Sequence, residues 1–218
     1  MRAKSAVLGV AAAAAFSSAA IAADCVKTSL TKYTAAGFSC TISDKTFSNF
    51  SYVNGDGKFP ATVSTVVPQP GPGNPGIIFA NNWTIPTAGK SSDFSIIFHV
   101  AAPKTNLIED AALSLNGSAK GTGFIIDSEN ILAAGIKIAN LTASITALHN
   151  VSSHVAFAPV PSITVEEDVV LRGFETLSLV DKRFSEQHIP EPASLALIGV
   201  GLTALGLARR RKSKSRPG

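Results

Sequence analysis

Short apolar runs separated by turn-forming residues constrain the fold of this chain more than any other feature. Val, Ile, Thr, Ser and Phe dominate the runs, and Gly, Pro or Asn interrupts them. About nine runs have the length of a strand, from KTFSNFSY at residue 45 to TLSLVDKRFSE at residue 176, with a turn signal about every ten residues. This rhythm predicts an all-β fold, a single antiparallel β-sandwich of the jelly-roll or Ig-like kind.

Alternation within the runs supports the strand assignment. In ATVSTVV, for example, Val63, Thr65 and Val67 fall on one face of a strand. The alanines of residues 130–150 permit a helix, but the spacing of Ile and Thr there favours strands. Residues 67–76 contain four prolines and three glycines, which predicts a rigid surface loop, either for a ligand or as a connection between the two sheets.

The start of the chain predicts export. Arg2 and Lys4 precede an apolar stretch that ends in the small-residue sequence Ala20-Ile21-Ala22. This order is typical of a secretory signal peptide, here residues 1–22. The β-sandwich domain is then expected to occupy residues 23–188, enough for one substantial core.

The positive charges of the chain lie mainly at its two ends. Between Ala23 and Pro190 there are 11 Lys and Arg residues and 14 Asp and Glu residues, so this part carries a charge of −3 although the whole chain carries +4. A mildly acidic domain does not attract a phosphate backbone. The charge distribution therefore predicts no nucleic-acid partner.

Cys25 and Cys40 are the two cysteines of the chain. Both are expected to meet an oxidising periplasm after export. Neither lies in a C-x-x-C sequence and no histidine is near them, so a redox or metal role has little support. We predict a disulfide between them, worth roughly 3 kcal/mol on the chain-entropy model.

No pattern of catalytic or metal-binding residues stands out in the domain. His149 and His154 are five apart without a carboxylate at a zinc-ligand spacing, which favours surface or turn histidines. Glu166, Glu167 and Asp168 are able to bind calcium if a loop gathers them, but on a strand they favour a charged sheet edge that resists aggregation. We expect no enzymatic activity, no cofactor and no metal.

The aromatic residues leave two interpretations of Trp83 open. With Tyr33 and Tyr52 it is able to form a platform on which a sugar ring stacks, because aromatic rings offer flat apolar faces. Its neighbours Phe79 and Ile85, however, are typical of a core position.

The last thirty residues, 189–218, predict a membrane-associated segment. Residues 193–208 are uncharged and span about 24 Å as a helix, slightly less than a hydrocarbon core of roughly 30 Å. Arg209, Arg210 and Arg211 follow and are expected to stay on the cytoplasmic side. The predicted arrangement leaves the β domain outside the inner membrane.

The segment before this apolar stretch is expected to be extended. Pro190 and Pro192 fix their own φ angles and disfavour helix at Glu191. The order of Pro190, Glu191, Pro192 and Ala193, an apolar helix and an Arg run resembles the PEP-CTERM sorting signal of Gram-negative exopolysaccharide producers. The segments CTISDKTFSNFSY, GPGNPGIIFANNW, ITVEEDVVL and RFSEQHIPEPAS also resemble recurring segments of one group of PEP-CTERM proteins.

This resemblance implies recognition by exosortase, a membrane-embedded enzyme that removes the tail. The chain is then expected to be anchored transiently in the inner membrane and later to reach the cell surface or the extracellular matrix. The alternative hypothesis is a carbohydrate-binding module that engages exopolysaccharide directly. A hydrolase whose site the sequence does not reveal is a third possibility.

Overall fold

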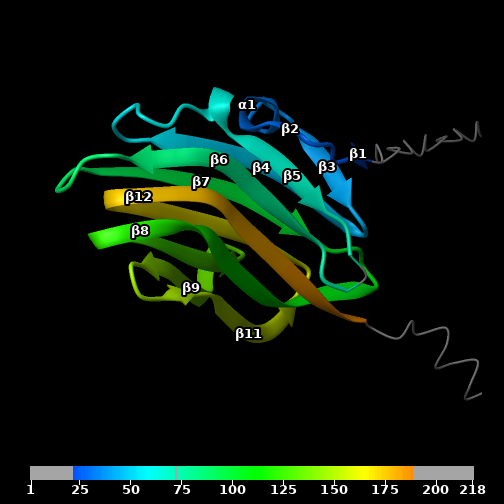
Figure 1. Ribbon diagram of the computed structural model, residues 1–218. Coiled ribbons are helices and arrows are strands. Elements are labelled where there is room, and N and C mark those ends of the chain that lie inside the picture. Colours follow the sequence, from blue (N-terminus) through cyan, green and yellow to red (C-terminus); the bar gives the residue numbers. More distant parts are fainter. Residues whose placement is uncertain (1–21, 72, 189–218) are drawn as a thin grey trace, which may run out of the picture.

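A computed structural model describes residues 22–71 and 73–188 and confirms the predicted all-β fold. Figure 1 shows its elements. In chain order they are β1 (Ala23–Asp24), β2 (Thr28–Ser29), α1 (Leu30–Tyr33), β3 (Ser39–Ile42), β4 (Lys45–Asn54), the 3-10 turn η1 (Ala61–Val63), β5 (Thr65–Gln69), β6 (Gly76–Ile85), β7 (Ser91–Ala101), β8 (Asn106–Ala133), β9 (Ile136–Thr146), β10 (Asn150–Val151), β11 (Ser153–Val160) and β12 (Ser162–His188).

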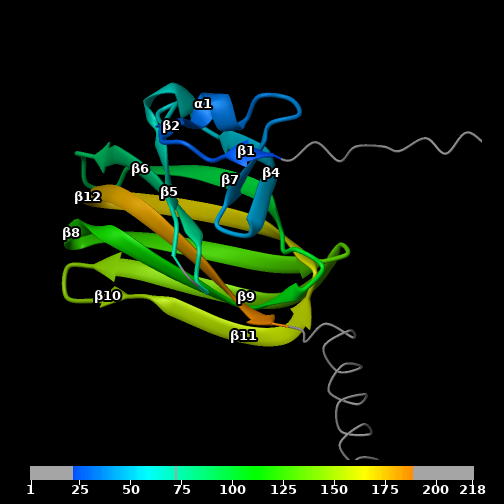
Figure 2. The same cartoon turned by 90° about the vertical axis from the view of Figure 1, so that its right-hand side faces the viewer.

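The strands of the described ranges form one twelve-stranded sheet that folds into two layers (Figure 2). One layer contains β1, β3, β4, β7, the first half of β12, the second half of β8, β9 and β10. The other contains β2, β5, β6, the second half of β12, the first half of β8 and β11. Neighbouring strands are antiparallel except β1 and β3, which are parallel.

β8 and β12 belong to both layers, because each is long enough to cross from one to the other. They pair with each other from Thr164 and Leu132 at one end to His188 and Asn106 at the other. The sequence pattern predicts a turn about every ten residues, whereas β8 and β12 are 28 and 27 residues long and continue through bends at Gly121 and Gly173. Both glycines have positive φ angles, 58° and 96°, and the register shifts beside Gly173. Bends of this kind allow a strand to change layers.

Aromatic side chains fill the space between the layers. Phe98 of β7 is fully buried and lies within 6.3 Å, between ring centroids, of four other rings: Phe47, Phe50, Phe79 and Phe184. Both layers supply these rings, since β4 and β7 belong to one and β6 and the end of β12 to the other. The predicted strand at residues 130–150 is also present, as β9 and the end of β8.

A bulge explains how Phe47 and Phe50 both face the core. Residues three apart on a regular strand point to opposite faces. Asn49 has a φ of 54°, and the register between β4 and β7 shifts between Ser48 and Ser51. The extra residue of the bulge turns Phe50 back to the buried side.

Two local predictions near β5 are wrong. Residues 61–63 form a 3-10 turn instead of a strand, and Val66, not the face of Val63, Thr65 and Val67, enters the core: Val63 is 56% exposed and Val66 is 0% exposed. Residues 67–69 continue β5 and pair with β6, so the Pro-rich loop is shorter than predicted and closes a hairpin within one layer. Pro68 is tolerated because β2 pairs only with Thr65 and Val66, which leaves this end of β5 at an edge.

The predicted disulfide between Cys25 and Cys40 is present. The two Cα atoms are 4.8 Å apart, within the range that a disulfide spans. Cys40 lies on β3, where Ala23 is its partner on β1, so the bond fixes the start of the domain to its first layer.

Candidate functional site

A pocket opens where β8 and β12 bend. A Cβ atom at Gly173 would lie 2.8 Å from the Cα atom of Gly123, and one at Gly123 would lie 2.9 Å from Oε2 of Glu175. Only glycine at both positions allows the two strands to come this close. The bend places Phe174 and Glu175 at the pocket, at the start of the second half of β12.

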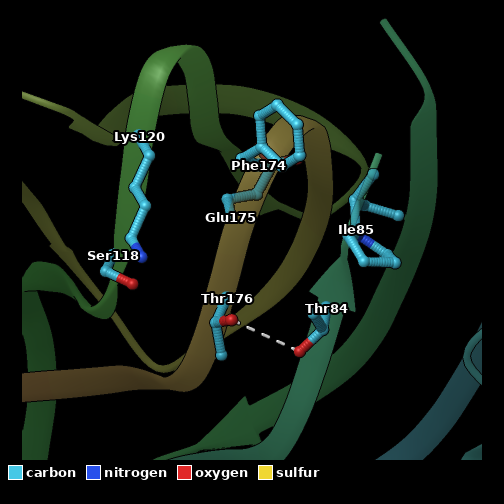
Figure 3. Close-up of a pocket in the computed structure, with 8 residues that line it drawn as sticks. Thr84, Ile85, Ser118, Lys120, Phe174, Glu175 and Thr176 are labelled. Carbon is cyan, nitrogen blue, oxygen red and sulfur yellow. Dashed lines mark hydrogen bonds between the residues drawn. The ribbon is translucent and has the colours of Figure 1, made fainter. Parts of the chain in front are cut away.

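Three strands supply the lining of this pocket, which has a volume of about 190 Å³. Figure 3 shows Phe174 and Glu175 of β12 between Lys120 of β8 and Ile85 at the end of β6. The remaining lining residues are Thr84, Pro86, Ser118 and Thr176. The hydroxyl oxygens of Thr84 and Thr176 are 3.3 Å apart and hydrogen-bonded.

The carboxyl group of Glu175 is the unusual member of the pocket. Glu175 is only 3% exposed, and neither carboxyl oxygen has a hydrogen-bond partner among the described residues. Burial raises the pKa of Glu175 from its ordinary 4.5 to about 7, because the charged form loses hydration without compensation. Near neutral pH the group therefore exists in both forms, so it is able to donate or accept a hydrogen bond.

Phe174 gives the pocket an exposed ring. It is 48% exposed, and no other Phe, Tyr or Trp side chain of residues 22–71 and 73–188 is exposed. Also on β12, the guanidinium carbon of Arg172 lies 6.0 Å from the ring centroid of Phe124 on the neighbouring strand β8, at the limit of a cation–π contact. An apolar ring, hydroxyl groups, an amine and a titratable carboxyl thus lie on one stretch of surface.

These groups are able to form hydrogen bonds with a ligand and to pack against an apolar face of it. Hydrolysis of a glycosidic bond by the usual route needs two carboxyl groups that flank the bond. Glu175 is the one carboxyl residue among the eight that line the pocket. The pocket offers one orienting carboxyl group and several hydrogen-bonding groups around an aromatic face.

Trp83 does not form a ligand platform. It is 0% exposed and stacks on Phe94 at 4.9 Å between ring centroids, so the core interpretation is correct. Tyr33 is also fully buried, and its hydroxyl donates to the carbonyl of Val26. Tyr52 is half-buried, and its hydroxyl donates to the carbonyl of Phe59.

The prediction of a charged sheet edge at Glu166, Glu167 and Asp168 is also wrong. These residues lie on β12 between β7 and β8, in the middle of a layer. Glu167 is 2% exposed and points between the layers. Within the described part of the chain, no three His, Cys, Asp or Glu side chains are placed to hold a metal ion.

His149 and His154 lie at the surface. His154 is exposed, and its Nε2 atom is 3.3 Å from Oδ2 of Asp110. His149 is exposed in the turn between β9 and β10, where its carbonyl accepts a hydrogen bond from the amide of Thr146. They lie on different elements and share no site.

The predicted sorting segment lies outside the described residues. This applies to Pro190, Glu191, Pro192, Ala193, Arg209, Arg210 and Arg211, and also to signal-peptide residues 1–21. Among the helices that the structure does describe, none has the length and apolar character needed to cross a membrane.

A comparison with protein families identifies this tail. Residues 188–212 match the model of the PEP-CTERM protein-sorting motif. The chain carries a PEP-CTERM sorting signal. PEP-CTERM proteins are exported and sorted at the cell surface, and the motif implies processing by exosortase.

The search of curated proteins finds no match to this chain. Among solved structures it is similar to TmCBM61 in complex with β-1,4-galactotriose, at 13% identity and a TM-score of 0.37, over 64% of this chain and 88% of that one. It is also similar to the enzymatically active domain of bacteriophage CBA120 tailspike protein 4, at 16% identity and a TM-score of 0.27, over 68% of this chain and 20% of that one. At these identities the likeness concerns the β fold alone.

Proposed function

We propose that this PEP-CTERM protein is a non-enzymatic component of the cell surface or extracellular matrix, delivered there after exosortase recognises its Pro-Glu-Pro segment. The match of residues 188–212 to the sorting motif is the observation that carries the proposal. The last strand ends at His188, so the folded domain and the sorting segment are adjacent without overlap of the Pro-Glu-Pro residues.

The Pro-Glu-Pro segment acts through its backbone. Proline fixes φ and disfavours helix at the residue before it, so the sequence predicts an extended backbone at Ile189 and Glu191. Processing enzymes bind their substrates as extended segments. Without the prolines, we expect helix to become possible in this segment and the recognised conformation to be lost.

The test replaces Pro190 and Pro192 by Ala and follows the protein in fractions of the native host. We expect the variant to be exported, to lose its signal peptide and to stay in the inner membrane with its tail attached. Pro70→Ala, an exposed proline of the β5–β6 loop, is the control and should be processed normally. Processing of the double variant at the wild-type rate would show that Pro-Glu-Pro is not the recognised element.

A second candidate function is direct binding of exopolysaccharide in the pocket beside Phe174. The specific observation is an exposed aromatic ring next to the buried carboxyl of Glu175 and the hydroxyls of Thr84 and Thr176. The C–H groups of a pyranose are able to pack on the ring while its hydroxyls bond to the polar groups.

Binding of the mature protein to a glycan array and to matrix polysaccharide from the host tests this candidate. Phe174→Ala and Glu175→Gln should each weaken binding at least tenfold. Ile136→Ala is the control, because Ile136 is 71% exposed at the start of β9 and does not line the pocket. Equal binding by the wild type and by a folded Phe174→Ala variant would exclude this pocket as the site.

A further inference from the structure

Four charged side chains are buried together between the two layers. Lys182, Asp127, Glu129 and Glu167 all have side chains with 0% exposure. The Nζ atom of Lys182 is 3.3 Å from Oδ2 of Asp127 and 3.4 Å from Oε2 of Glu167, and it donates a hydrogen bond to Oε2 of Glu129. Buried charges normally occur as satisfied pairs, whereas here one ammonium faces three carboxyl groups.

The cluster bridges the layers. Lys182 lies on the half of β12 that pairs with β6, whereas Glu129 lies on the half of β8 that pairs with β9. Glu129 and Glu167 are direct cross-strand partners, an arrangement that is unfavourable when both are charged. Oδ1 of Asp127 and Oε1 of Glu129 have no hydrogen-bond partner among the described residues.

Protonation of Glu167 resolves part of this imbalance. As a carboxylate Glu167 finds no hydrogen-bond donor for either oxygen, but as an acid it donates to Asp127. Burial and the neighbouring charge of Asp127 raise the pKa of Glu167 well above its ordinary value. Burial lowers the pKa of Lys182, but the three carboxyl groups outweigh this effect and raise it overall, which favours the ammonium form. Burial also raises the pKa values of Asp127 and Glu129.

We propose that Lys182 and Glu129 condense into an intramolecular amide bond between the two layers. Such a condensation needs an amine and a carboxyl group that are held in contact, groups that relay protons, and exclusion of water. The contacts of Lys182 with Glu129, Asp127 and Glu167 provide the first two, and their complete burial provides the third.

The reaction balances without any other reactant. The ammonium of Lys182 passes one proton to Asp127, and its nitrogen lone pair attacks Cδ of Glu129 to form the C–N bond. The C–O bond breaks, and the oxygen leaves as water with the proton of Glu167 and a second proton from the nitrogen. The proton on Asp127 then returns to Glu167. One ammonium and one carboxylate become one amide and one water, and no oxidant, metal or nucleotide is needed.

The amide explains why charged residues occupy this position in the core. It removes one positive and one negative charge from a dry environment and leaves Asp127 and Glu167 with a single shared proton. It also joins β8 to β12 six residues before the described part of the chain ends at His188. The disulfide between Cys25 and Cys40 lies near the start of the described chain, so a covalent cross-link would be present near both of its ends.

Peptide mapping of the mature full-length protein tests the proposal directly. Cleavage after Lys and Arg releases peptide 121–137, which contains Glu129, and peptide 173–182, which ends in Lys182. If Lys182 is acylated it is not a cleavage point, and the second peptide becomes 173–183. We expect one species whose mass is the sum of both peptides less one water, without cleavage after Lys182. Fragmentation should place the bond on Glu129. Recovery of the two peptides separately, or attachment at Asp127 or Glu167, overturns the proposal.

Variants identify the role of each group. Glu129→Gln should give the same cross-linked product with loss of ammonia in place of water, whereas continued loss of water would mean another acceptor. Asp127→Asn and Glu167→Gln keep the reacting pair and should slow the cross-link at least tenfold in freshly folded protein. Glu166→Gln, on the opposite face of β12, is the control and should react as the wild type does. The peptide map of the wild type is sufficient to show whether the amide bond is present. The proposal can therefore be rejected even if a variant does not fold.

Discussion

Replacing Glu175 by Gln should change how the stability of the domain depends on pH. In the folded protein the pKa of Glu175 is raised from 4.5 to about 7 by burial. Between these pH values the folded state holds a proton that the unfolded state has lost. The stability associated with the protonated group is therefore fully present below pH 4.5 and is lost as the pH rises through 7. Gln keeps the shape of the neutral acid but does not titrate.

The size of the effect follows from the shift. A difference of about 2.5 pKa units corresponds to about 3 kcal/mol, because one unit is worth about 1.4 kcal/mol. This is an upper value, since water entering the pocket on ionisation reduces the penalty. Relative to Glu175→Gln, the wild type should lose up to about 3 kcal/mol of unfolding free energy between pH 4.5 and 8.

Urea denaturation of the wild type and Glu175→Gln at closely spaced pH values measures this difference. Asp127, Glu129 and Glu167 also have raised pKa values, but they affect both proteins equally and cancel. Thr176→Val is the matched control, because it removes a hydrogen bond of the same pocket without a titrating group, so its difference from the wild type should not vary with pH. Parallel curves for the wild type and Glu175→Gln would refute the raised pKa.

Three other substitutions test the fold. Phe98→Ala should lower the unfolding free energy by about 3–5 kcal/mol in chemical denaturation, since Phe98 contacts four buried rings, whereas exposed Phe174→Ala should change it by less than about 1 kcal/mol. The double change of Cys25 and Cys40 to Ser should remove roughly 3 kcal/mol, and alkylation of the unreduced wild type should find no free thiol. Gly173→Ala should lower the thermal midpoint of unfolding more than Gly37→Ala does. Both glycines have positive φ angles, but of the two only Gly173 has backbone close to where a Cβ atom would lie, 2.8 Å away. Equal shifts of the midpoint would argue against the close approach of the strands at the bend.

The strand periodicity of the sequence is sufficient to predict much of the buried pattern. Every second residue from Ile163 to Leu177 is buried, and the same holds from Gly123 to Ile131. The rule places the carboxyl groups of the cluster and Glu175 inside, and Phe174 outside. The sequence motifs do not indicate Phe174 or Glu175 as site residues. The alternation of buried and exposed positions along the strand is the sequence signal that identifies them.

Bulges and bends limit such reasoning. The register between β12 and its neighbours shifts between Leu177 and Leu179, after which the buried residues are Val180, Lys182 and Phe184. A regular strand continued through this region would place Lys182 in solvent. The position of such an irregularity depends on which strands lie on either side, and that is a property of the tertiary structure rather than of the local sequence.

The order of the strands relates folding to sorting. β12 is the last strand of the described chain, yet it separates β7 from β8 in one layer and β6 from β8 in the other. Until residues 162–188 are available, β6, β7 and β8 each keep an unpaired edge, so neither layer is complete. The residues that distinguish the PEP-CTERM motif begin only after His188, where this strand ends. Under the proposed function, a chain held by its tail has already exported every described strand, so we expect the sheet to close before the tail is removed.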